Sequence, residues 1–263
     1  MRNRIYCAAP EGNSLKKTVL KFLMRLGMYP HIRFTYSPFK ILEFQEMMRR
    51  AEFRGDERSL DIGCGDGLQT FLIGENSGPI TGIDVNSSFI ADAREYAKIF
   101  HPKAQADFRD QPLEKIGFKD EEFDLVFSIC VIEHIDNHEE VLRECLRIMK
   151  PGAKIIFTVD TLETIDDSAL IQKHKAAHHV VRYFREDSLR ELLTGIGFEV
   201  QEMQNLFRSD LARELFIQGI NRGFNFGRLR CTSLADELAR AEARTDLKAP
   251  GTFLLAVAVK PGS

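Results

Sequence analysis

An apolar segment followed by three glycines at alternate positions constrains the fold of this chain more than any other feature. Residues 60–67 read LDIGCGDG. Because glycine has no Cβ, the backbone of such a turn can adopt conformations that other residues avoid and can approach a ligand closely. A helix after the turn would offer unpaired backbone N–H groups. The stretch therefore predicts a strand, a tight ligand-binding turn and a helix in succession.

The charges in this turn indicate which ligand it accepts. A dinucleotide-binding turn has the pattern G-x-G-x-x-G, and Leu68 stands where its third glycine would be. Asp61 before the turn and Asp66 inside it would repel a pyrophosphate, whereas they suit a cationic sulfonium and an amino group. The turn therefore favours S-adenosylmethionine over a dinucleotide.

The segments that follow have the pattern of a parallel sheet. Residues 81–86 (TGIDVN) predict a second strand that ends in Asp84, at the distance from the turn where a ribose-binding carboxylate is expected. Residues 123–130 form a nearly continuous apolar run, typical of a buried parallel strand. A helix is predicted over residues 137–150, closed by Pro-Gly, and a strand over residues 154–160.

In order and spacing, these segments resemble the class I S-adenosylmethionine-dependent methyltransferases of the ubiquinone/menaquinone-methylase-like group. The resemblance covers residues 56–204 and the last apolar segment. It implies that Asp61, Gly63 and Gly65 hold the methionine end of the cofactor and that Asp84 holds the ribose. It also implies that Asp110 with Gln111 meets the adenine, with Asp107 as the other candidate. The full set of expected cofactor-binding residues is Asp61, Gly63, Cys64, Gly65, Gly67, Asp84, Val85, Asp110, Gln111, Ile129 and Cys130.

Alternating strands and helices predict an α/β fold with a doubly wound, Rossmann-like sheet. The resemblance adds that the sheet has seven strands and that the last inserts antiparallel beside the fifth. We expect a helical lead-in or cap over residues 1–54, a methyltransferase core over 55–204, a helical insertion over 205–250 and a closing strand over 251–263.

Two segments are long enough to cover a substrate site at the carboxyl ends of the strands. Residues 161–180 are polar and weakly periodic, which predicts a mobile loop or short helices. Residues 205–250 predict two amphipathic helices separated by a flexible tip rich in aromatic residues and arginine. The insertion is expected to act either as an acceptor lid or as a packing or homodimer contact.

Charge is distributed unevenly along the chain. Residues 1–54 hold eleven Lys or Arg and four Glu, whereas the remainder has more acidic than basic residues. Within residues 15–26 the apolar side chains share one helical face, and lysines crowd the others. This segment predicts either a cap helix or a peripheral contact with an anionic membrane. Specific nucleic-acid binding is not expected, since the chain is acidic overall and has no Trp.

A hydroxyl acceptor must lose its proton, and the candidate bases are His134, His178, His179 and Asp160. Some members of the resembled family bind a divalent metal through the pattern E-x-x-E-H. Here Cys130 replaces the first of those acids, and only Glu133 and His134 remain. No metal site is therefore assigned.

The sequence leads us to expect a methyltransferase that acts on a small molecule, namely a quinone-like or lipid-like compound or a saccharide intermediate. Oxygen is the expected methylated atom. The alternatives are a related transferase on the same fold, a cofactor-binding module without activity, and a protein or RNA methyltransferase. Five scattered cysteines without a C-x-x-C pattern favour a reducing cytoplasm. No apolar run is long enough to span a membrane.

Overall fold

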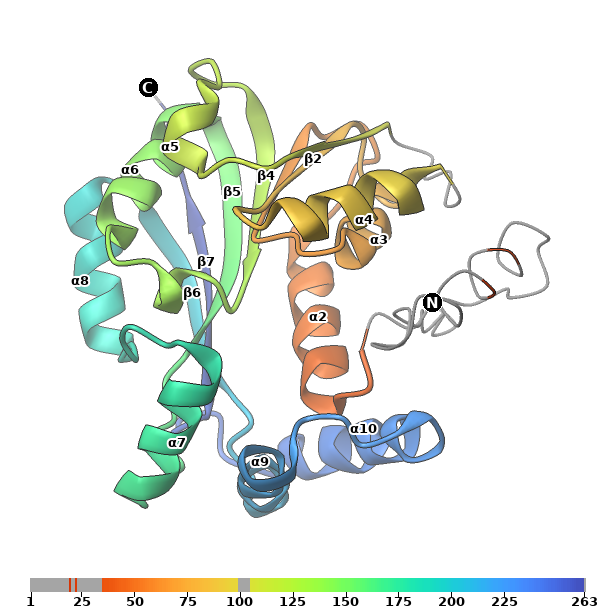
Figure 1. The fold of residues 1–263 in the computed structure, drawn as a ribbon. Coiled ribbons are helices and arrows are strands. Elements are labelled where there is room, and N and C mark those ends of the chain that lie inside the picture. The colour runs from red at the N-terminus through yellow and green to blue at the C-terminus, as the bar shows by residue number, and fades with distance from the viewer. Residues whose placement is uncertain (1–18, 20–21, 23–34, 99–104, 263) are drawn as a thin grey trace.

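The computed structural model describes residues 19, 22, 35–98 and 105–262. Its centre is one seven-stranded sheet in the order β3-β2-β1-β4-β5-β7-β6 (Figure 1). Strand β7 pairs antiparallel with both β5 and β6, and the other neighbouring strands are parallel. The strands are β1 Ser59–Ile62, β2 Ile80–Ile83, β3 Ala106–Arg109, β4 Phe123–Ile129, β5 Met149–Asp160, β6 Glu199–Leu206 and β7 Phe253–Val259. The predicted fold and the antiparallel insertion of the last strand are confirmed.

Helices cover both faces of this sheet and also lie across the carboxyl ends of β4 and β5 (Figure 1). One hydrophobic core joins the sheet to α5, α6 and α8, and a second joins it to α2, α3, α9 and α10. The helices are α2 Pro38–Ala51, α3 Leu68–Gly74, α4 Ser87–Ala97, α5 Leu113–Ile116, the 3-10 turn η1 Ile132–His134, α6 His138–Ile148, α7 Ser168–His178, α8 Glu186–Ile196, α9 Asp210–Arg222 and α10 Arg228–Glu242.

Helix boundaries follow local signals in the sequence. Pro38 occupies the first turn of α2, where its missing N–H costs nothing. The side chains of Asn86 and Asp167 cap α4 and α7 by accepting backbone N–H groups. Ser209 caps α9, and its hydroxyl also donates to Glu242 Oε1 of α10 at 2.7 Å. The two helices predicted for the insertion are therefore present and tied together.

Two local expectations differ from the structure. Helix α6 ends at Ile148 and β5 begins at Met149, because Met149 already pairs with Phe123 of β4. The tip between α9 and α10 was expected to be flexible, but it packs against α9: the ring centroids of Phe224 and Phe216 are 4.9 Å apart. The backbone N–H of Phe226 also donates to the carbonyl of Tyr36, which joins the tip to the residues before α2.

The predicted amphipathic segment over residues 15–26 lies outside the described residues, apart from positions 19 and 22. Among the described helices, none combines the length and the apolar character that crossing a membrane requires. The described cysteines, Cys64, Cys130, Cys145 and Cys231, form no disulfide.

Candidate functional site

The glycine turn, residues 63–67, is held by backbone hydrogen bonds between β1 and β2. The N–H groups of Gly63 and Cys64 donate to the carbonyl of Ile83 at 2.8 and 3.0 Å. The N–H of Gly65 donates to Asp84 Oδ2 at 3.0 Å, and that of Asn86 donates to Asp84 Oδ1 at 2.8 Å. Asp84 therefore lies at the turn, as the spacing predicted, and its carboxylate orders the backbone around it.

The three glycines of the turn have different surroundings. All three have positive φ, a conformation that favours glycine. A Cβ on Gly63 would lie 2.2 Å from Val131, and one on Gly67 would lie 2.7 Å from the Phe108 ring. A Cβ on Gly65 would have no neighbour within 4 Å. Only Gly65 thus presents its backbone to open space, whereas Gly63 and Gly67 make room for protein side chains.

Asp61 is fully buried at the end of β1. Its carboxylate accepts hydrogen bonds from Gln69 Nε2 at 3.2 Å and from Thr70 Oγ1 at 2.6 Å. Burial raises the pKa of Asp61 to about 7. The carboxylate fastens the first turn of α3 to the strand, and its contact with the methionine end of a cofactor stays a prediction.

The remaining residues expected at the cofactor follow neighbouring strands of the same sheet edge. Val85 is 73% exposed just after β2, a high value for an apolar side chain. Asp110 and Gln111 are exposed just after β3, and Asp110 Oδ1 lies 3.5 Å from Arg94 Nη2. The alternative, Asp107, pairs with Arg109 at 2.9 Å. Adenine contacts at these positions stay predictions.

A cavity of about 870 Å³ opens at the carboxyl ends of β4 and β5. We call it the acceptor cavity, because the sequence led us to expect the acceptor at this end of the strands. Its walls come from the start of α2, from α7 and α9, and from the tip after α9. Phe39, Phe216, Phe224 and Phe253 give these walls an aromatic surface. Ile129 and Cys130, expected beside the cofactor, line it as well. The segments around residues 161–180 and 205–250 do border this cavity, and α2 is a third border that the sequence did not predict.

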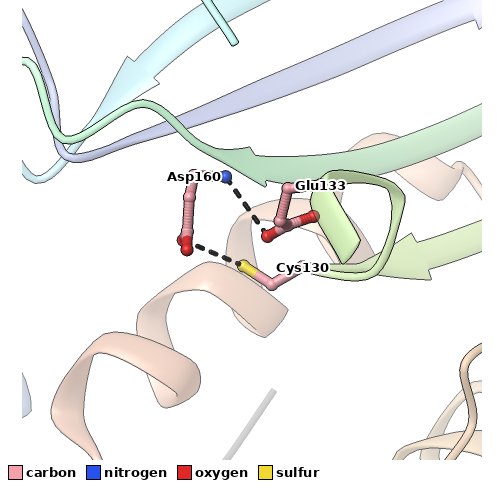
Figure 2. A group of neighbouring side chains, drawn as sticks. All are labelled: Cys130, Glu133 and Asp160. Carbon is pink, nitrogen blue, oxygen red and sulfur yellow. Dashed lines mark hydrogen bonds between the residues drawn. The ribbon is translucent and has the colours of Figure 1, made fainter. Parts of the chain in front are cut away.

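Acidic and thiol groups lie close together beside this cavity, which Cys130 and Asp160 line. Figure 2 shows these two side chains with that of Glu133. One sulfur or oxygen atom from each lies within 4.8 Å of the others. The backbone N–H of Asp160 donates to Glu133 Oε1 at 3.3 Å, and the Cys130 thiol lies 3.9 Å from Asp160 Oδ1. Burial raises the pKa of Glu133 well above its ordinary value, and it raises that of Asp160 to about 7.

Helix α2 adds an ion pair to this cluster. Lys40 Nζ lies 2.8 Å from Glu43 Oε2, and the Glu43 side chain is fully buried. Glu43 Oε1 accepts hydrogen bonds from Thr158 Oγ1 at 2.5 Å and from the Cys130 thiol at 3.0 Å. Burial lowers the pKa of Lys40, but Cys130 and Glu43 raise it more, so the ammonium stays protonated. The ammonium group of Lys40 is therefore a cation within the cluster. That no metal binds here stays a prediction.

The predicted histidines occupy different places around the cavity. His134 and His178 line it, and burial lowers the pKa of each. His134 Nδ1 lies 3.4 Å from the backbone carbonyl of His179. The His179 side chain is exposed where α7 ends and is not among the residues that line the cavity. The structure thus brings His134 and His178, but not His179, to the cavity with Asp160.

Lys40, Glu43 and His174 also lie near this cavity, and the sequence patterns did not indicate any of the three. His174 is 4% exposed on α7, and its Nε2 lies 3.9 Å from Asp160 Oδ2. Its other nitrogen lies 3.1 Å from the hydroxyl of Tyr183. Burial lowers the pKa of His174 to about 3. The one available signal was the four-residue spacing of His174 and His178, which places both on one face of a helix.

The known proteins to which this chain is similar include methyltransferases. Residues 60–157 match the family model of a methyltransferase domain. The chain is 26% identical over 199 residues to a ubiquinone biosynthesis O-methyltransferase of Rhizobium leguminosarum, covering 72% of this chain and 78% of the relative. It is 27% identical to a malonyl-[acyl-carrier protein] O-methyltransferase of Enterobacter lignolyticus, covering 66% and 68% of the two chains.

Among solved structures, the fold is similar to that of the [4+2]-cyclase SpnF, with a TM-score of 0.61, 19% identity, and coverage of 84% of this chain and 81% of the other. Residues 60–157, which match the methyltransferase family model, contain the glycine turn, Asp84 and β4. These are the parts from which the sequence predicted a site for the methyl donor. Together these findings support a class I S-adenosylmethionine-dependent methyltransferase.

Proposed function

We propose that this methyltransferase binds S-adenosylmethionine at the glycine turn and transfers its methyl group to a hydroxyl oxygen of an aromatic or lipid-like small molecule. The observation that carries the proposal is the acceptor cavity, whose aromatic walls enclose Asp160, His134 and His174 at the ends of β4 and β5. In open α/β sheets, ligands bind at the carboxyl ends of the strands.

The chain has a suitable place for the cofactor. Gly65 offers its backbone to open space, and Asp84 lies beside it, where its Oδ2 accepts the N–H of Gly65. Gly65 would let the cofactor approach the backbone, and Asp84 would accept hydrogen bonds from the ribose hydroxyl groups. The bound cofactor would supply an electrophilic methyl group.

The cavity favours an acceptor with an apolar body. Four phenylalanine side chains line it, whereas a saccharide would require polar partners for many hydroxyl groups. The two relatives named above are both called O-methyltransferases, which supports oxygen as the methylated atom. A quinone-like or lipid-like acceptor therefore fits better than a saccharide.

Mass spectrometry with S-adenosylmethionine that carries a trideuterated methyl group tests this proposal. The purified protein is incubated with this donor and with fractionated cell extract, and labelled products are sought. We expect label on an oxygen of an organic-soluble small molecule. Label in protein or RNA would contradict the proposal, and tight cofactor binding without turnover in any fraction would identify a binding module.

We also propose that residues 15–26 bring the enzyme to an anionic membrane surface that holds an amphiphilic acceptor. The support is the lysine-rich helical pattern in the sequence. Reversing the charges of Lys16, Lys17 and Lys21 should weaken flotation with phosphatidylserine vesicles by about 1 kcal/mol per charge. Absence of flotation by the wild type at low salt would favour the cap-helix alternative.

A further inference from the structure

We infer that the reacting hydroxyl group of the acceptor, an acidic aromatic hydroxyl, binds between Asp160 and His174, where Asp160 takes its proton and His174 holds its oxygen. This inference rests on the proposed O-methylation. Both side chains line the acceptor cavity, and they are only 5% and 4% exposed. They come from β5 and α7, so neither belongs to the motifs of the cofactor side.

The distance between the two groups suits a bridging oxygen atom. Asp160 Oδ2 and His174 Nε2 are 3.9 Å apart, which is too far for a direct hydrogen bond. An oxygen atom beside this gap can lie about 2.8 Å from both atoms at once, a normal hydrogen-bond distance. A hydroxyl group there donates its hydrogen to the carboxylate and accepts one from the imidazole, so both buried groups gain a partner.

Tyr183 allows His174 to act as that donor. The Tyr183 hydroxyl lies 3.1 Å from His174 Nδ1 and 3.3 Å from the carbonyl of Ile171. When this hydroxyl donates to Nδ1, the imidazole proton is on Nε2, which faces Asp160. When it donates to the carbonyl instead, Nδ1 carries the proton. The histidine can therefore change tautomer without losing its partner.

The charges around the pair assign the base role to Asp160. Burial keeps the imidazole of His174 neutral, whereas the pKa of Asp160, raised to about 7, makes it a proton acceptor near neutral pH. Among the described residues, the charged or titratable groups around Asp160 are Lys40 and Glu43 of α2, Cys130 and Glu133 near the end of β4, His174 of α7, and Tyr183. Lys40 favours the ionised carboxylate, and Glu43 opposes it.

The reaction balances with these groups. The hydroxyl proton moves to a carboxylate oxygen of Asp160, and the acceptor oxygen forms the new bond to the methyl carbon. The bound cofactor would supply the methyl group: its carbon–sulfur bond would break and the electron pair would stay on sulfur, which leaves a neutral thioether. Asp160 then releases the proton to solvent through the cavity. No oxidant or further co-reactant is required.

Binding of 4-nitrocatechol in the presence of S-adenosylhomocysteine tests this subsite, because its ionised form absorbs visible light. We expect the wild type to bind it with increased ionised-form absorbance below the pKa of the free compound. His174→Phe, which keeps a planar aromatic ring and removes both nitrogens, should weaken binding about tenfold, the loss of one charge-assisted hydrogen bond. In Asp160→Asn the absorbance increase should disappear.

His138→Phe is the matched control, since His138 is also a buried histidine but does not line the cavity. It should leave probe binding within twofold of the wild type. The subsite is refuted if the wild type does not bind the probe, or if His174→Phe and Asp160→Asn behave like this control. Two further measurements test the proposed function separately: calorimetry with S-adenosylhomocysteine and the trideuterated-methyl assay. If both give the expected result while the probe experiment does not, only the subsite is wrong.

Discussion

Two neighbouring regions at the carboxyl ends of the strands, the glycine turn and the acceptor cavity, are assembled from the chain in different ways. The turn and Asp84 lie within 22 consecutive residues, and backbone N–H groups make most of its hydrogen bonds. The cavity takes side chains from α2, β5, α7 and α9, which are far apart in the sequence. One region depends on backbone conformation, and the other depends on how separate helices pack.

This difference has a consequence for how the two regions respond to change. If the turn binds the cofactor as proposed, cofactor affinity should be sensitive to any substitution that alters the backbone of the turn. The acceptor side depends on buried charged groups whose ionisation is set by neighbours from other elements. Substitutions should therefore separate cofactor affinity from the rate and pH dependence of methyl transfer.

The largest effect is expected from Asp160→Asn, which keeps the side-chain shape and removes the proton acceptor. Loss of a general base should lower the rate of methyl transfer by roughly 10²–10⁴. Affinity for S-adenosylhomocysteine, measured by calorimetry, should stay within a few-fold of the wild type. An equal loss of cofactor affinity would contradict the proposal that the two regions have separate roles in cofactor binding and methyl transfer.

Asp84→Ala should act in the opposite way, on the cofactor. It removes charge-assisted hydrogen bonds worth roughly 1.5–3 kcal/mol, so affinity for S-adenosylmethionine should fall about tenfold to a hundredfold. Asp124→Ala is the control, because Asp124 also accepts a backbone N–H, from Arg58 at 3.0 Å, but lies at the start of β4. Equal affinity of the wild type and Asp84→Ala would contradict the ribose assignment.

Lys40→Met tests whether the charge of α2 sets the pH dependence of the acceptor side. For the wild type, the rate should rise as the pH increases through about 7, because Asp160 must lose its proton to act as the base. Without the ammonium, the pKa of Asp160 should rise by about one unit or more, and the acidic limb of the pH–rate profile should move upward by the same amount. Lys40→Arg retains the positive charge and should keep the profile near that of the wild type. An unchanged profile in Lys40→Met would show that Lys40 has only a structural role.

The smallest effect is expected from Gly65→Ala, compared with Gly117→Ala. Both glycines have positive φ and no atom within 4 Å of an added Cβ, so both variants should lose about 1–2 kcal/mol of stability. Only Gly65→Ala should also weaken cofactor binding, by roughly 0.5–1.5 kcal/mol, as expected if a close backbone contact is lost. Thermal unfolding and calorimetry measure the two quantities separately. Equal cofactor affinity in the two variants would place the cofactor away from Gly65.

The sequence by itself determined the sheet, the glycine turn and the position of Asp84. These features depend on apolar runs, glycine spacing and the distance from one strand to the next, all of which are properties of short segments. The resemblance also correctly placed the last strand antiparallel beside the fifth. Neither the sequence nor the resemblance revealed that Gly63 faces Val131 and that Gly67 faces Phe108, because these contacts join separate elements.

Only the tertiary structure decided which groups meet in the acceptor cavity. Lys40 and Glu43 lie in a helix whose sequence has no catalytic pattern, and they reach Cys130, Thr158 and Asp160 because α2 packs across the sheet. The sequence does not distinguish His174 from the other histidines. In the structure, α7 lies over the end of β5 and places His174 beside Asp160. Burial then altered the pKa of both residues, and burial is a property of the packed molecule that segment patterns do not contain.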